Sequence, residues 1–297
     1  MAHSDKRAAD LIGALGIVTH IDYTDGRYAD VDRVLSSLDF LGIDLVREHA
    51  PNPSSDLYGQ QHLGRAAEAG LKIVFNLSGS VDPTVAVMRV HDFVVSHPGS
   101  VVGIEGPNEV NNWPVTYMGK TGAAAAVAYQ QAVFSAVESD PLLRDIPILG
   151  FTGYSVASAS DWTYIHTYAK NGDQPFSWIE SARAEQMAAD PGKPFVLTEI
   201  GYHTSLTADT AGGWEGVDPS TQARLLLNVI MDAAAMGAKQ TFLYELLDAY
   251  ADPGGANQER HFGLFAYDFT PKPAATAIHN LTSILADEGA TASTFAT

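Results

Sequence analysis

The feature of this sequence that most limits its fold is a regular alternation between short apolar runs and longer amphipathic segments. Strand-length apolar runs that alternate with helix-length patterns are typical of a parallel sheet covered by helices. We expect strands at residues 15–21, 44–49, 72–77, 101–105, 147–152, 164–168, 195–199 and 240–244. We expect helices near residues 30–41, 57–69, 83–97, 121–139, 175–189, 219–236 and 271–286.

Eight strand–helix units in succession favour an α/β fold of the (β/α)8 class, the TIM barrel, over an open doubly wound sheet. No Gly-x-Gly-x-x-Gly follows the first strand, so the signature of a dinucleotide-binding open sheet is missing. No linker, repeat or charge block divides the chain. We therefore predict a single domain over residues 1–297, with a core at about 13–286 and a short C-terminal tail. The connection 153–161 is too short for a full helix, so the fifth unit is the least regular.

Local residue choices support several of these boundaries. Asp82-Pro83 and Asp218-Pro219 each place an aspartate cap before a proline in the first helical turn. Gly42, Gly70 and Gly237 follow predicted helices, where a left-handed residue is expected to end the helix.

The composition excludes several classes of function. Lys and Arg number 17 against 35 Asp and Glu, a formal net charge of −18, and no basic cluster interrupts this balance. Such a surface repels nucleic acids and anionic lipids but is compatible with a neutral polysaccharide. No run approaches the roughly 18 apolar residues of a membrane span. The absence of cysteine excludes disulfides, thiolate zinc sites and cysteine nucleophiles. We predict no nucleic-acid or membrane partner and leave the oligomeric state open.

Polar and aromatic side chains follow almost every predicted strand. In a barrel of this class, side chains at the C-terminal ends of the strands converge on one face. Sugar hydroxyls need many hydrogen-bond donors and acceptors, and aromatic rings stack on the apolar faces of sugars. The residues at these ends are His20, Asp22, Arg47, His49, Asn76, Asn108, Glu109, His166, Tyr168, Glu199, Tyr202, Tyr244 and Glu245.

Two of these residues are carboxylates that follow apolar strands. Glu109 ends the segment Gly106-Pro107-Asn108-Glu109 after the fourth strand, and Glu199 ends the seventh. Cleavage of a glycosidic bond needs two facing carboxylates, one that protonates the leaving oxygen and one that attacks or stabilises the anomeric carbon. The sequence therefore predicts a glycoside hydrolase that needs neither a cofactor nor a metal.

With Asn-Glu after strand four and Glu after strand seven, the chain resembles clan A of the retaining glycoside hydrolases. The residues that carry the resemblance are Gly106–Glu109, Thr198-Glu199, Arg47 within Val-Arg-Glu-His, and Ile165-His166-Thr167-Tyr168. The resemblance implies that Glu109 is the general acid/base and Glu199 the nucleophile.

The same resemblance implies supporting roles for the neighbouring residues. Asn108 would hydrogen-bond the 2-hydroxyl of the sugar. Arg47 would keep Glu199 ionised and aligned, because a nearby guanidinium favours the carboxylate form. The alternative role for Arg47 is a structural ion pair with Glu48 or Asp44. His166 or Tyr168 would hydrogen-bond the catalytic pair.

Aromatic residues are expected to form the sugar-binding platforms. Strand eight of this clan often ends in Trp, whereas this chain has Tyr244-Glu245. Tyr244, Trp113 or Trp214 is expected to take the place of that Trp. The segment from Tyr244 to Asp248 also resembles, more loosely, members that degrade bacterial exopolysaccharides.

We therefore predict a retaining β-glycosidase that cleaves a polysaccharide, in an endo manner, by double displacement. We expect it to be secreted or periplasmic, with a leader that is absent from this sequence. One alternative is a metal-dependent polysaccharide deacetylase or amidohydrolase, because His20-x-Asp22, with His49 and His166, partly matches the histidine pattern of such barrels. The other is a barrel that only binds glycans, which would have no need for both carboxylates beside Asn108 and Arg47.

Overall fold

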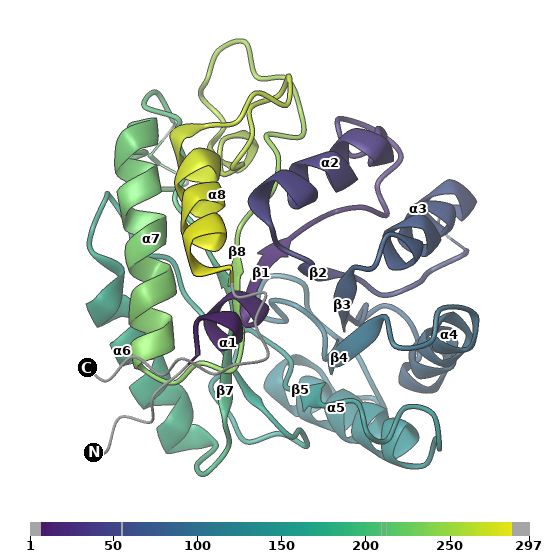
Figure 1. Ribbon diagram of the computed structural model, residues 1–297. Helices are drawn as coiled ribbons and strands as arrows, with labels where there is room; N and C mark the ends of the chain where they lie inside the picture. Colours follow the sequence, from purple (N-terminus) through teal and green to yellow (C-terminus); the bar gives the residue numbers. More distant parts are fainter. Residues whose placement is uncertain (1–6, 55, 209, 212, 287–297) are drawn as a thin grey trace.

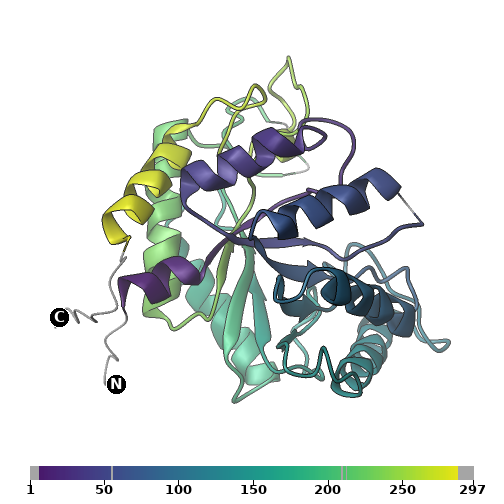
Figure 2. The ribbon, with the colours of Figure 1, turned by 45° about the vertical axis from the view of Figure 1, so that its right-hand side comes forward.

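The computed structural model describes residues 7–54, 56–208, 210–211 and 213–286, and within them eight parallel strands form a barrel surrounded by helices (Figures 1 and 2). The order of the strands in the sheet is β5-β4-β3-β2-β1-β8-β7-β6. The strands are β1 (Leu15–Val18), β2 (Leu45–His49), β3 (Lys72–Asn76), β4 (Val101–Glu105), β5 (Ile148–Leu149), β6 (Thr163–His166), β7 (Phe195–Ile200) and β8 (Thr241–Leu243).

The barrel closes between β5 and β6 through a single parallel bridge that joins Leu149 to Trp162. The backbone N–H of Gly150 donates to the Trp162 carbonyl at 3.1 Å, and the Trp162 N–H donates to Ile148 at the same distance. The predicted (β/α)8 fold is therefore confirmed, with its weakest seam at the fifth unit.

Every strand except β5 is followed by an α-helix, and the predicted lack of a helix in the fifth connection is correct. The six-residue helix α1, which precedes the barrel, was not predicted, because so short a segment shows no clear period. The helices are α1 (Ala8–Gly13), α2 (Val31–Leu41), α3 (Leu57–Glu68), α4 (Pro83–Ser96), α5 (Gly122–Glu138), α6 (Pro175–Ala189), α7 (Pro219–Ala235) and α8 (Pro273–Leu285), with a 3-10 turn, η1 (Gln258–Arg260), after β8.

The predicted helix boundaries have the expected local causes. The Asp82 carboxylate accepts from the N–H groups of the first turn of α4, and Asp218 does the same at α7. Gly42, Gly70 and Gly237 all have positive φ after their helices. These contacts stabilise the helix ends because they satisfy N–H groups that have no partner inside the helix.

The apolar core has two layers. Inside the barrel, side chains from alternating positions of six strands pack together: Val18, Leu45, Val74, Leu149, Val196 and Phe242. Gly16 leaves room for this layer, because a Cβ at Gly16 would lie only 2.5 Å from the Phe242 ring. The larger layer fills the space between the strands and the helices, with residues such as Val46, Leu226 and Ile278. The strands are apolar on both faces for this reason.

Five strands end earlier than predicted. Residues 19–21, 77, 150–152, 167–168 and 244 were predicted as strand but lie outside the sheet, because the chain turns there into loops at the C-terminal face. The predicted C-terminal tail lies outside the described residues, and the single-domain assignment for residues 1–297 stays a prediction.

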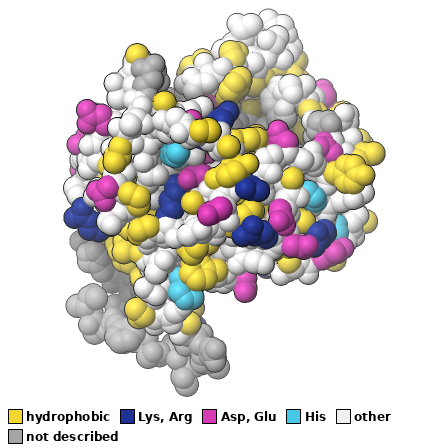
Figure 3. Space-filling view, turned by 90° about the horizontal axis from the view of Figure 1, so that it is seen from above, with side chains coloured by type: hydrophobic (Ala, Val, Ile, Leu, Met, Phe, Trp, Pro, Cys, Tyr) yellow, Lys and Arg dark blue, Asp and Glu magenta, His cyan; other side chains and the backbone are white. Residues whose placement is uncertain are grey.

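Of the helices in the described part of the chain, none combines the length and apolar character needed to cross a lipid bilayer. On the face shown in Figure 3, acidic, basic and apolar side chains are interspersed.

Candidate active site

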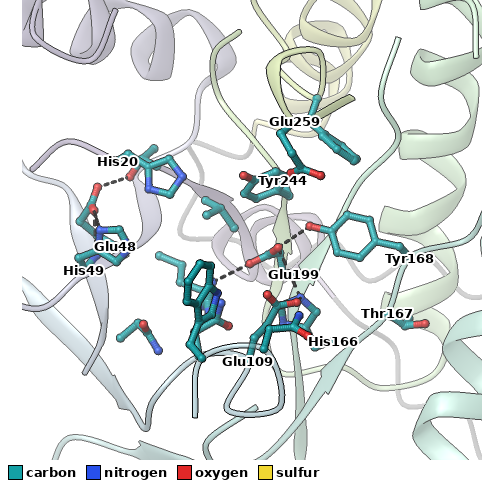
Figure 4. Close-up of a pocket in the computed structure, with 18 of the residues that line it drawn as sticks. His20, Glu48, His49, Glu109, His166, Thr167, Tyr168, Glu199, Tyr244 and Glu259 are labelled. Carbon is teal, nitrogen blue, oxygen red and sulfur yellow. Dashed lines mark hydrogen bonds and ion pairs between the residues drawn. The ribbon is translucent and has the colours of Figure 1, made fainter. Parts of the chain in front are cut away.

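A cavity of about 850 Å³ lies among the loops at the C-terminal ends of the strands (Figure 4). The structure brings most of the predicted site residues together around it. The predicted residues that line it are Arg47, His49, Asn76, Asn108, Glu109, Trp113, His166, Tyr168, Glu199, Trp214 and Tyr244.

Two residues predicted to bind substrate do not line this cavity. Tyr202 is 2% exposed, and its hydroxyl donates to the Asp173 carbonyl at 2.8 Å, because the chain turns after β7 and directs this side chain towards α6. Glu245 is 3% exposed and lies behind His20, with 3.5 Å between Glu245 Oε2 and His20 Nε2. Burial raises the pKa of Glu245 well above its usual value. Neither residue can therefore contact a substrate in this cavity, and both instead support neighbouring parts of the chain.

Glu199, near the end of β7, is held by three side chains. Arg47 Nη1 lies 3.0 Å from Glu199 Oε2, and the Tyr168 hydroxyl donates to Oε1. His166 Nε2 lies 3.4 Å from the same Oε1. Burial alone raises the pKa of Glu199, but the charges of His166 and Arg47 and the hydrogen bond from Tyr168 outweigh it and lower the pKa to about 2. Glu199 is thus a buried carboxylate that is ionised at neutral pH.

Arg47 organises the floor of the site. Its guanidinium binds Glu105 of β4 through two hydrogen bonds, Nε to Oε2 at 2.6 Å and Nη2 to Oε1 at 2.8 Å. Its ion-pair partners are therefore Glu105 and Glu199, and not the predicted alternatives Glu48 and Asp44. Glu105, which is fully buried, was not predicted as a site residue. The available signal was a charged residue in an otherwise apolar inner strand.

Asn108 is fixed by its carbonyl oxygen. Arg47 Nη2 donates to Asn108 Oδ1 at 2.8 Å, and the Thr152 hydroxyl donates to the same oxygen at 2.9 Å. Because Oδ1 is occupied, the amide NH2 is left as the group that Asn108 can offer to a ligand. Asn76 donates to the Gly106 carbonyl at 2.6 Å and so supports the backbone of this loop.

Glu109 is placed by its backbone. Its φ is 43°, and its N–H donates to Thr152 Oγ1 at 2.6 Å. The N–H groups of Asn112 and Trp113 both donate to its carbonyl at 2.8 Å. The side chain of Glu109 is 32% exposed, whereas that of Glu199 is 10% exposed. Trp113 is 72% exposed at the rim, directly after this turn.

His166 connects the two carboxylates. Its Nε2 lies 3.4 Å from Oε1 of Glu109 and 3.4 Å from Oε1 of Glu199, and Figure 4 shows the three side chains together. The two carboxylate oxygens are therefore no more than twice this distance apart. Burial opposes the charge of His166, but the carboxylate of Glu199 dominates and raises the pKa of His166.

An aromatic wall stands beside Glu199. The Tyr168 ring lies 5.7 Å from that of Trp214 and 6.2 Å from that of Tyr244, between ring centroids. Phe262, 5.3 Å from Tyr244, belongs to the same wall, and Trp178 also lines the cavity. The sequence did not single out Phe262, since its loop position gives no period. Aromatic rings that flank a polar floor are suited to sugar rings, which have apolar faces and polar edges.

Of the residues behind the metal-dependent alternative, His20 and His49 line the same cavity as Glu109 and Glu199, and Asp22 binds His49. His20, Glu48 and His49 have possible ligand atoms within 4.8 Å of one another. The Glu48 carboxylate already accepts hydrogen bonds from Thr19, Ile21 and His49, which occupy most of its lone pairs. Burial lowers the pKa of His20 to about 3, so its imidazole is neutral. His166 faces Glu109 and Glu199 instead of this trio.

No family model and no curated protein matches the sequence. Solved structures do match the fold. A family 39 glycoside hydrolase from Bacteroides cellulosilyticus WH2 has a TM-score of 0.66 at 14% identity, over 92% of this chain and 64% of that one. A GH2 β-galacturonidase from Eisenbergiella tayi has a TM-score of 0.66 at 15% identity, over 91% of this chain and 51% of that one.

A β-glucuronidase from Ruminococcus gnavus, bound to D-glucuronic acid, has a TM-score of 0.60 at 20% identity, over 91% of this chain and 49% of that one. This chain thus spans between about half and two thirds of the length of these proteins. The fold and the site together define a (β/α)8 barrel with Glu109 and Glu199 at one cavity, and its structural neighbours are glycoside hydrolases.

Proposed function

We propose that this protein is a retaining β-glycosidase that cleaves a polysaccharide internally. The observation that carries the proposal is the pairing of Glu109 and Glu199 across one nitrogen of His166, in a cavity flanked by aromatic rings. Two carboxylates with different surroundings can divide the work of an acid and a nucleophile. The glycoside hydrolase neighbours in fold space support the same class of activity.

In the first step, Glu199 attacks the anomeric carbon while Glu109 donates a proton to the glycosidic oxygen. The leaving sugar departs as an alcohol, and a glycosyl ester on Glu199 remains. In the second step, Glu109 accepts a proton from water, and that water displaces Glu199 from the anomeric carbon. Arg47 and Tyr168 serve Glu199 by holding its charge and orientation before the attack.

Other residues position the sugar. The amide NH2 of Asn108, left available by the contacts of its oxygen, donates to the 2-hydroxyl of the sugar attached to Glu199. Tyr244 and Trp214 contact the sugar faces on the side of Glu199, and the exposed Trp113 contacts the sugar on the leaving side of Glu109. A platform beyond the acid/base favours a polymer substrate, and action on a polymer favours a location outside the cytoplasm.

The distance between the carboxylates supports retention. Retaining enzymes place their two carboxyl groups roughly 5–5.5 Å apart, and inverting enzymes roughly 6.5–9.5 Å apart. Because each Oε1 atom lies 3.4 Å from the same His166 nitrogen, the two atoms are at most twice 3.4 Å apart. This limit allows the retaining spacing and only the lower end of the inverting range.

The test is proton NMR of the first products, together with their sizes. New reducing ends that initially carry the β-anomer, in fragments of intermediate length, support a retaining endo-enzyme. Early α-anomers would refute double displacement, and release of single sugars would refute internal cleavage. Neither of these two results would change the assignment as a glycosidase.

A further inference from the structure

The charged side chains around the cavity are unevenly balanced. Four carboxylates line it, Glu48, Glu109, Glu199 and Glu259, against two permanently basic side chains, Arg47 and Lys170. Arg47 is neutralised by its ion pairs with Glu105 and Glu199. Lys170 is exposed, with its ammonium group 5.4 Å from the centre of the Trp214 ring. Burial raises the pKa of Glu48 well above its usual value, and Glu199 is paired with Arg47, so the carboxylates left for a ligand are those of Glu109 and Glu259.

Glu259 is the carboxylate that the glycosidase mechanism does not use. It lies on η1, in the loop after β8, and Figure 4 shows it beside Tyr244, with its carboxylate directed towards that ring. Its Oε1 accepts a hydrogen bond from Gln258 Nε2 at 2.9 Å. The neighbouring Arg260 donates to the Ala251 carbonyl instead. Among the described residues, no basic side chain forms an ion pair with Glu259.

The surroundings of Glu259 favour a positively charged group. Burial, and after it the charges of Glu245, Glu199 and Glu259, raises the pKa of Tyr244 well above its usual value, so its hydroxyl stays neutral. The Tyr244 ring lines the cavity and can attract a cation, whereas the Trp214 ring already has the Lys170 ammonium group 5.4 Å from its centre. An ammonium group here would meet a carboxylate and an aromatic face together. A carboxylate ligand would meet repulsion from Glu259.

We propose that the substrate is a polymer of hexosamine units with free, protonated amino groups, and that Glu259 binds the ammonium group of the sugar beside Tyr244. This inference rests on the proposed glycosidase function. A charge-assisted hydrogen bond between ammonium and carboxylate is roughly twice as strong as a neutral one, so Glu259 discriminates a free amine from its N-acetylated form. The formal net charge of −18 also attracts a cationic polymer to the molecule over long distances.

This substrate class differs from those of two structural neighbours. These are described as a β-galacturonidase bound to galacturonate and a β-glucuronidase bound to D-glucuronic acid, which are both anionic sugars. In the cavity of this chain, the cation available to such a carboxylate is Lys170 at the rim, because Arg47 is already paired. Lys170 is therefore the residue to change when binding of an anionic sugar is tested.

The first experiment measures binding by calorimetry in a Glu199→Gln background, which prevents turnover. The probes are short hexosamine oligosaccharides with free amino groups in gluco and galacto configurations, their N-acetylated forms, and oligouronates. We expect the free-amine forms to bind roughly tenfold more tightly than the N-acetylated ones, and Glu259→Gln to abolish this difference. The matched control is Glu215→Gln, which removes the same charge from an exposed residue beside Trp214 that does not line the cavity.

Each outcome decides the proposal. Loss of the preference in Glu259→Gln but not in Glu215→Gln supports it. Equal binding of N-acetylated forms, binding of no probe, or an equal effect of both variants overturns it. Tighter binding of oligouronates that depends on Lys170, shown with Lys170→Met, assigns the anionic class instead. Hydrolysis assays keep the two proposals apart, because unchanged turnover in Glu199→Gln refutes the glycosidase mechanism and not the ammonium site.

Discussion

Glu109 and Glu199 are the same residue type at the same face of the barrel, but their environments differ. Glu199 is 10% exposed and is held through its side chain by Arg47, Tyr168 and His166. Glu109 is 32% exposed and is held through its backbone by Thr152 and the turn that follows. A nucleophile must stay ionised and aligned, whereas an acid/base must exchange protons with substrate and water. In the proposed mechanism, contacts and not residue type therefore divide the two roles.

The sharpest test of the comparison is Glu199→Gln. The amide keeps the size of the side chain but cannot form a glycosyl ester, so turnover should fall by roughly four orders of magnitude or more. Circular dichroism should show an unchanged fold. Activity close to that of the wild type, in material free of other glycosidases, would remove Glu199 from the role of nucleophile.

Glu109→Ala should have a large effect that depends on the substrate. Loss of general acid catalysis costs roughly 10² to 10⁴ in rate for natural glycosides, but far less for aryl glycosides whose leaving groups need little protonation. Azide, which attacks the glycosyl ester without a base, should restore activity and yield a glycosyl azide. If both substrate types slow equally and azide has no effect, the acid/base role lies elsewhere.

Arg47→Met tests the side-chain network around Glu199. It leaves the buried carboxylates of Glu105 and Glu199 without their cation, so the free energy of unfolding should fall by about 3–5 kcal/mol. Urea unfolding measures this loss. The double variant Arg47→Met/Glu105→Gln removes one of the unpaired charges and should recover part of the stability. If the double variant recovers no stability, the unpaired charge of Glu105 is not what destabilises the Arg47→Met variant.

Tyr168→Phe should cause a smaller change that is seen mainly in the pH profile. The Tyr168 hydroxyl is one of the groups that lower the pKa of Glu199 to about 2. Its removal raises that pKa, so activity should be lost at a higher pH on acidification than in the wild type. The profile of kcat/KM against pH measures the shift, with a rate loss of roughly tenfold. An acid limb at an unchanged pH would show that Tyr168 does not tune Glu199.

Removal of divalent metals should have the smallest effect. If Glu109 and Glu199 perform the chemistry, dialysis against EDTA leaves turnover unchanged. Loss of activity that zinc restores would favour the metal-dependent alternative, with His20, Glu48 and His49 as the ligands. His49→Ala would then abolish the metal response, whereas the glycosidase mechanism assigns His49 no catalytic step.

The sequence was most informative where structure is local. Asp82-Pro83 and Asp218-Pro219 mark helix starts because the caps lie within a few residues of the N–H groups that they satisfy. The order of strands and helices followed from hydrophobic periodicity. The fifth strand was overestimated, because a two-residue ladder depends on how the barrel closes against Trp162, and periodicity contains no information on closure.

The sequence also placed both carboxylates at one face, since the C-terminal ends of parallel strands meet there regardless of the side chains. It did not reveal which other residues reach them. Glu105 and Thr152 entered the site only through contacts across 43 or more positions, such as that between Thr152 and Glu109. Phe262 entered it through its ring contacts with Tyr244 and Tyr168. Tyr202 and Glu245 left it because the loops after β7 and β8 turn their side chains away from the cavity.

The sequence by itself thus determined the barrel and the positions of Glu109 and Glu199 along it, because both depend on a repeating pattern of short-range preferences. Only the tertiary structure decided that Arg47 binds Glu105 as well as Glu199, that one nitrogen of His166 contacts both carboxylates, and that Glu259 faces Tyr244. These contacts depend on distances of a few ångströms between residues far apart in the chain. Such distances are fixed by how the strands and loops pack against one another.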